Sequence, residues 1–150
     1  MNILAAIDFS GVTDDVVQKT LTLASALQAK VFLLHAIVPA TPIFDIEANI
    51  DAWTPVAKIA ESDRPELPAY ERLLEIARAL QNANLDVSVS IAHNNEVDAI
   101  IEAAETSCAG LIVLGSHGHG ALYHLLVGSV SEGVVRKASC PVVIVPARKQ

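Results

Sequence analysis

The sequence has no long apolar run. No segment approaches the roughly 20 consecutive apolar residues that a membrane-spanning helix requires, and no charged stretch followed by an apolar one opens the chain. These absences argue against a membrane partner, and they predict a cytoplasmic protein.

Positive charge is also scarce. Ten lysines and arginines stand against 17 aspartates and glutamates, which gives a formal net charge of −7. Because binding to nucleic acid depends on neutralising phosphates, this balance argues against nucleic acid as a partner.

Cysteines and aromatic residues are few. The chain contains two cysteines, and aromatic residues make up 4% of it. Lone thiols in a cytoplasmic chain are usually small buried hydrophobes, so we expect no redox role for Cys108 and Cys140. A hydrophobic content of 52% with so few aromatics indicates aliphatic strands buried on both faces. This favours an α/β fold, and the length is that of a single domain, 1–150.

Five apolar segments read as strands, and helical periodicity fills stretches between consecutive strands. One of these segments, 86–92, alternates apolar and polar residues, which is typical of a half-exposed strand at a sheet edge. The residues expected to start or stop helices are Thr13 or Asp14, Asn94 or Asn95, and Asn84. The predicted strands are Ile3–Ile7, Val31–Ala36, Asp86–Ala92, Leu111–Leu114 and Val142–Val145.

This alternation predicts a doubly wound, Rossmann-like α/β fold. We expect a five-stranded parallel sheet in the order 3-2-1-4-5, with helices on both faces. Ligands of such sheets bind at the carboxyl ends of the strands, where the strand order reverses. Here that switch point lies between the first and fourth strands, which end at Asp8 and Gly115. The functional site is expected there.

Residues 39–68 break the alternation. They contain five of the seven prolines, and a connection of this length is typical of a functional lid, a partner surface or a partly disordered loop. Trp53 within this segment either lies over a ligand or packs the loop onto the domain.

The most distinctive stretch runs from Gly115 to Glu132. An apolar strand leads into Gly115-Ser116-His117-Gly118-His119-Gly120, and a helical pattern opens at Gly128-Ser129. Such a helix start offers free N–H groups and the positive end of the helix dipole to an anion such as a phosphate. A purely structural interpretation also exists, in which the glycines turn the chain and Ser129 forms a capping box with Glu132.

The spacing of Gly115, Gly118 and Gly128-Ser129 resembles the nucleotide-binding signature of the universal stress protein family. The resemblance extends to Ala5-Ala6-Ile7-Asp8-Phe9-Ser10 and to Cys140-Pro141-Val142-Val143-Ile144-Val145-Pro146, so it covers nearly the whole chain. It implies an adenine nucleotide as the ligand, ATP or else ADP or AMP, with any Mg²⁺ arriving through the phosphates.

The resemblance also implies the binding residues. Asp8 would accept hydrogen bonds from a ribose hydroxyl, as acidic residues do in other nucleotide-binding α/β folds. Its alternative role is to cap its own turn. The backbone of Ile7 and Ala36 would hold the adenine ring, and Leu114 would line that pocket. The residues that resemble the phosphate cradle are Gly115, Gly118, Gly128, Ser129, Val130 and Ser131.

The leading hypothesis is therefore a universal stress protein that binds ATP and acts as a stress-response regulator, through its conformation or a signalling partner. Hydrolysis should be slow or absent, because the sequence has neither the lysine of a G-x-x-x-x-G-K-[ST] loop nor an evident catalytic base. Two alternatives stay open. One is an interaction module that binds no nucleotide, and the other is an adenine-nucleotide hydrolase or transferase.

The histidines do not indicate a metal site. His117, His119 and His124 lie close together in the sequence, but no cysteine or carboxylate accompanies them at zinc-like spacing. His35 ends a predicted strand, and we expect its ring to bond to backbone.

The last predicted strand, Val142–Val145, is an uncharged edge of the sheet between Pro141 and Pro146. A bare apolar edge is a template for pairing with another chain. Two copies could pair there across a two-fold axis, and the family resemblance implies such a dimer too. We therefore expect a homodimer built on residues 142–145.

Overall fold

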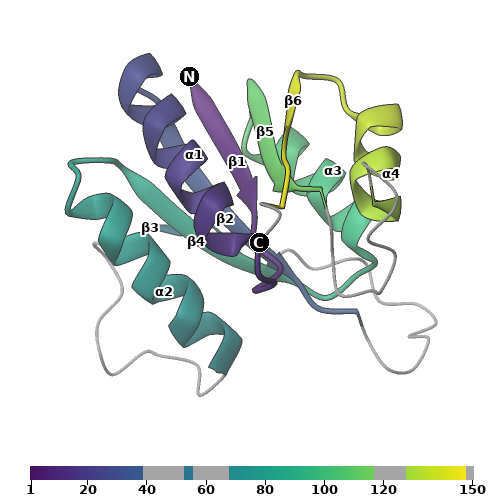
Figure 1. The fold of residues 1–150 in the computed structure, drawn as a ribbon, viewed down its shortest axis with the longest axis horizontal. Coiled ribbons are helices and arrows are strands. Elements are labelled where there is room, and N and C mark those ends of the chain that lie inside the picture. Colours follow the sequence, from purple (N-terminus) through teal and green to yellow (C-terminus); the bar gives the residue numbers. More distant parts are fainter. Residues whose placement is uncertain (39–52, 56–67, 117–127, 148–150) are drawn as a thin grey trace.

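The computed structural model describes residues 1–38, 53–55, 68–116 and 128–147. Within them strands alternate with helices, much as the sequence predicts (Figure 1). The strands are β1 (Asn2–Ala6), β2 (Lys30–Ala36), β3 (Thr54–Pro55), β4 (Val87–Ala92), β5 (Leu111–Gly115) and β6 (Val142–Val145). The helices are α1 (Thr13–Leu27), α2 (Pro68–Gln81), α3 (Glu96–Thr106) and α4 (Ser129–Lys137).

The strands form one sheet in the order β3-β4-β2-β1-β5-β6. Apart from β3 they are all parallel, and their order confirms the predicted 3-2-1-4-5 arrangement. The addition is β3, which pairs antiparallel with β4 so that Thr54 lies opposite Val89. A strand of two residues that includes Pro55 is too short to show the alternation by which strands are recognised in a sequence.

Helices cover both faces of the sheet, α1 and α2 on one side and α3 and α4 on the other (Figure 1). The first layer encloses a core that includes Ile3 and Leu73. The second encloses Leu4 and Ile112. Neighbouring residues of one strand therefore enter different cores, which explains why the strands are aliphatic throughout.

The prediction that the strand at 86–92 is half-exposed is wrong. Every residue of β4 except Ser88 is buried, and Ser90 is 1% exposed. The cause is the segment around β3, which the sequence pattern could not place. Trp53 packs against the core under α3 and α4, with its ring edge-on to Phe32 at a centroid distance of 5.0 Å. This contact confirms the expectation that Trp53 packs its segment onto the domain.

The predicted helix ends are right at two places and wrong at one. Asn95 caps α3, since its side-chain oxygen accepts the Asp98 N–H at 3.0 Å. Asn84 takes the left-handed conformation just after α2, with φ 62°. Neither Thr13 nor Asp14 caps α1, however. The cap residue is Val12, without a side-chain hydrogen bond, because the Ser10 carbonyl accepts the Thr13 N–H instead.

The cysteines differ from the expected buried pair. Cys140 is half-buried, and this burial raises the pKa of its thiol. Cys108 is exposed, because α3 ends at Thr106 and the chain turns away from the core there. The turn puts Cys108 at φ 48° and closes with the Ala109 N–H donated to the Ala104 carbonyl.

None of the described helices is long and apolar enough to cross a membrane.

Candidate functional site

The strand order reverses between β1 and β5. These two strands are neighbours, and the chain leaves β1 toward β2 but leaves β5 toward β6. The register pairs Ala5 with Val113, so its continuation places Ile7 beside Gly115. Asp8 follows directly. The structure thus brings the first and fourth predicted strands together at their carboxyl ends, as the sequence indicated.

Helix α4 begins beside the end of β5. The Gly128 N–H donates to the Ser116 carbonyl at 2.7 Å, which fixes the start of the helix there. The first bond within the helix runs from the Glu132 N–H to the Gly128 carbonyl. The N–H groups of Ser129, Val130 and Ser131 therefore have no acceptor inside the helix. Together with the helix dipole, these donors form an anion-binding geometry at the switch point.

The alternative interpretation of Ser129 and Glu132 as a capping box is wrong. The cap residue of α4 is Gly128, at φ −75°, and it makes no side-chain cap. Ser129 is already the first helical residue, so its hydroxyl cannot cap the helix. The Glu132 carboxylate bonds to Arg136 at 2.7 Å one turn later rather than reaching back. Within the described part of the chain, the start of the helix is thus open, since no side chain of its own helix occupies these backbone donors.

Ser131 ties α4 to β5. Its side chain is buried at 2% exposure, and its hydroxyl donates to the Gly115 carbonyl at 3.0 Å. Since a hydroxyl has one proton to donate, the donor left for an anion in this geometry is the backbone N–H of Ser131.

Gly115 has a packing reason to be glycine. A Cβ built on it would lie 2.4 Å from Cγ1 of Val12, a buried residue at the start of α1. Its backbone needs no left-handed angle, since no described glycine has a positive φ. The residue therefore makes room for α1 at the point where β5 ends.

Asp8 lies in a turn that it stabilises itself. Its Oδ1 accepts the Ser10 N–H at 3.0 Å, which is the Asx-turn that the sequence offered as the alternative role. The carboxylate is therefore held in one orientation beside the end of β5. This bond does not prevent a carboxylate from accepting others, because each of its oxygens has two lone pairs.

Near the predicted adenine position, the backbone groups of Ile7 have partners within the sheet. Ile7 donates its N–H to the Leu34 carbonyl at 2.8 Å and accepts from His35 Nδ1 at 2.7 Å, which confirms the backbone bond expected for His35. Ala36 lies two residues beyond Leu34, so its backbone N–H and C=O point to the same side of β2 as those of Leu34. On that side they lie beyond the last residue of β1. The side chain of Leu114 is buried in the core under α3 and α4.

Sequence reasoning missed two side chains at this end of the sheet. The Phe9 ring lies 4.6 Å from the His35 ring, measured between centroids. The Arg72 guanidinium lies over the same ring, with Cζ 4.1 Å from its centroid. Both residues line a cleft of about 300 Å³ with Ser10 and Thr13. No spacing rule connects Phe9 with a residue of α2, so no sequence signal could have found the pair.

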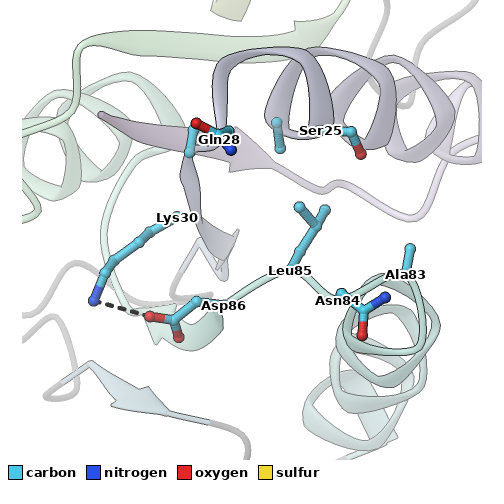
Figure 2. A pocket seen from close by; sticks show the side chains of 9 residues that line it. Ser25, Gln28, Lys30, Ala83, Asn84, Leu85 and Asp86 are labelled. Carbon is cyan, nitrogen blue, oxygen red and sulfur yellow. Dashed lines mark ion pairs between the residues drawn. The ribbon is translucent and has the colours of Figure 1, made fainter.

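A second, larger cleft lies at the opposite end of the strands. Its volume is about 480 Å³, and it lies between the ends of α1 and α2. Figure 2 shows Gln28 and Ser25 on one side, Asn84 and neighbouring residues on the other, and the Lys30–Asp86 ion pair, 2.9 Å long. Among the described residues that line it, the charged ones are this ion pair, which is exposed, and the cleft lies away from the switch point.

Some predicted residues lie outside the described part of the chain. They are Gly118, most of the segment 39–68, and His117, His119 and His124. Within the described ranges, no group of three or more histidine, cysteine, aspartate or glutamate side chains is arranged to hold a metal ion.

Comparison with known proteins settles the family. The model of the universal stress protein family matches residues 1–146. The chain belongs to that family. Universal stress protein MJ0531 of Methanocaldococcus jannaschii is 24% identical over 143 residues, which cover 95% of this chain and 80% of the relative. Other relatives are longer, and the match spans 38% of three mycobacterial universal stress proteins.

Two solved structures of universal stress proteins share the fold. One, in complex with cAMP, has a TM-score of 0.69 at 23% identity and covers 99% of this chain and 98% of its own. The other comes from Archaeoglobus fulgidus, in complex with dAMP. It has a TM-score of 0.65 at 20% identity, with 96% of both chains covered.

Proposed function

We propose that this chain binds an adenine nucleotide at the switch point between β1 and β5, with ATP as its ligand and Mg²⁺ held through the phosphates. The nucleotide's phosphates lie at the start of α4, and its ribose lies beside Asp8. In this proposal the protein is a stress-response regulator that acts through its conformation or a signalling partner. The cytoplasmic location expected from the sequence stays a prediction.

The observation that carries the proposal is the open start of α4. The N–H groups of Ser129, Val130 and Ser131 face no acceptor of their own helix, and Gly128 adds no side chain in front of them. Phosphate is the anion that such a helix start accommodates best. The solved relatives add support, since one is in complex with cAMP and another with dAMP.

The other predicted residues take complementary roles. The Asp8 carboxylate accepts from a ribose hydroxyl, and the backbone of Ile7 and Ala36 contacts the edge of the adenine ring. Leu114 contributes to the wall of that pocket, and Gly115 and Gly118 complete the phosphate cradle. Hydrolysis is expected to be slow or absent, because the sequence has no lysine of a G-x-x-x-x-G-K-[ST] loop.

The test of the proposal is titration calorimetry with ATP and GTP. Adenine and guanine present different donors and acceptors along the same edge, so fixed backbone groups should prefer ATP by about tenfold or more. Equal affinity for the two nucleotides would contradict the assignment of the base pocket. Failure to bind ATP at millimolar concentration would contradict the proposal as a whole.

We further propose a homodimer that pairs two copies along β6. Val142, Val143 and Ile144 are each half-buried rather than buried, and β6 is the last strand of its side of the sheet. A second copy would cover this apolar edge.

Val143→Lys should weaken that dimer about fivefold, because one cross-strand apolar pair contributes up to roughly 1 kcal/mol. Sedimentation equilibrium at micromolar concentration measures the effect, and Lys30→Met, at the start of the central strand β2, serves as the control. A mass of 15.9 kDa for the unmodified chain would mean a monomer and would exclude the dimer.

A further inference from the structure

Phe9 has an unusual backbone conformation next to the proposed ribose ligand. Its φ is 57°, in the left-handed region that a bulky side chain seldom adopts. Such a conformation costs free energy and persists only where surrounding contacts hold it. It occurs between Asp8 and Ser10, the two residues joined by the Asx-turn bond. The conformation of Phe9 therefore sets the orientation of the Asp8 carboxylate.

Two side chains hold the Phe9 ring, one from β2 and one from α2. The His35 ring packs against it from the end of β2, and His35 is itself fixed by the bond from Nδ1 to the Ile7 carbonyl. Arg72 reaches it from the first turns of α2, which start at the same end of the sheet as the carboxyl ends of the strands (Figure 1). A guanidinium over an aromatic face is attracted by the ring's negative electron density.

Arg72 has few other interactions in the described part of the molecule. Arg72 is exposed, and the interaction that the structure shows for its side chain is the contact with the Phe9 ring. Glu75 lines the same cleft, yet no ion pair joins the two among the described residues. Among the described residues, Arg72 therefore contacts the Phe9 ring rather than a carboxylate.

We propose that Phe9 and Arg72 are positioning residues for Asp8, and that they set the protein's preference for a nucleotide with an intact ribose. The Arg72–Phe9 contact stabilises the left-handed turn, and the turn presents the carboxylate to the sugar hydroxyls. This inference rests on the proposed function. The inference goes beyond that function because it assigns sugar selectivity to a residue of α2, the helix that follows the long segment 56–67.

The experiment compares Arg72→Met with Arg72→Lys and with Arg78→Met. Methionine keeps much of the side chain's length without its charge, lysine keeps a cation over the ring, and Arg78 is an exposed arginine later in the same helix. Each protein is titrated with AMP and with 2′,3′-dideoxy-AMP, which lacks both ribose hydroxyls. The unmodified protein should bind AMP about tenfold more tightly than the dideoxy analogue, which is the ratio expected for one hydrogen bond to a charged group.

In Arg72→Met that ratio should fall to about threefold, since a cation over an exposed ring contributes a factor of about two to five. Arg72→Lys should restore most of the ratio, and Arg78→Met should leave it unchanged. An unchanged ratio in Arg72→Met would overturn the proposal. So would an equal loss of affinity for both nucleotides, because that result would make Arg72 a direct phosphate contact or a general structural residue.

A measurement without nucleotide separates this inference from the proposed function. Hydrogen exchange of the Ser10 amide reports directly on its bond to Asp8, and Arg72→Met should accelerate it about threefold. Unaccelerated exchange would overturn the positioning role whatever the protein binds. Accelerated exchange in a protein that binds no AMP would leave the positioning of Asp8 supported and would refute the nucleotide assignment instead.

Discussion

Gly115→Ala should lower the free energy of unfolding by about 2 kcal/mol, because the added methyl group is forced into a filled core. The new Cβ would lie 2.4 Å from Cγ1 of Val12, which is buried. At this chain length the loss corresponds to a fall in Tm of about 4–8 °C. Thermal unfolding followed by circular dichroism measures it.

Two further variants make this prediction specific. Gly11→Ala is the matched control, because a Cβ on Gly11 would meet nothing within 4 Å, and its Tm should be unchanged or slightly raised. Val12→Ala removes the methyl groups that clash, so the double variant should be more stable than the sum of the single changes by about 1 kcal/mol or more. Strict additivity would show that the contact between Gly115 and Val12 is not the cause.

Gly128→Val should reduce the affinity for ATP at least about tenfold, which is roughly 1.4 kcal/mol. The valine side chain would lie in front of the free N–H groups of α4 and keep a phosphate from approaching them. The backbone itself tolerates the change, since Gly128 has φ −75° and ψ 165°. Only the cap preference is lost, at a cost of about 1 kcal/mol or less.

Calorimetric titration with ATP and thermal unfolding of the nucleotide-free variant together test this prediction. Gly110→Ala is the control, because it precedes β5 at the other end of the sheet and its Cβ would meet chiefly the flexible Met1 side chain. Normal ATP affinity in Gly128→Val would refute the phosphate cradle. A large loss of stability without nucleotide would show that Gly128 serves the fold instead.

The sequence was sufficient to predict the sheet because the strands are continuous aliphatic runs with helical periodicity between them. It also predicted the convergence of Asp8 and Gly115, which follows from strand order alone. The prediction that the strand at 86–92 is half-exposed was wrong for a physical reason. Alternation of apolar and polar residues indicates exposure only when one face of the strand stays uncovered. Here Trp53 and β3 close over the edge of the sheet beside it.

The details of the candidate site depended on contacts between distant residues. A glycine that follows a strand gives the same sequence pattern whether it faces a phosphate or makes room for Val12. The Ser129 capping pattern was misleading in a similar way, because the helix starts one residue earlier than a Ser129 cap requires and Gly128 takes the cap position. Phe9 and Arg72 meet only because α2 packs beside the turn after β1, which no local pattern encodes.

The most direct test of the central claim is a titration of ¹⁵N-labelled protein with ATP, followed by amide chemical shifts. Nucleotide binding at the switch point predicts that the largest changes occur at Ser129, Val130 and Ser131, with further changes at Asp8. Saturable shifts there would support the proposed site. Shifts confined to the opposite cleft around Gln28 and Asn84, or no shifts at millimolar ATP, would contradict it.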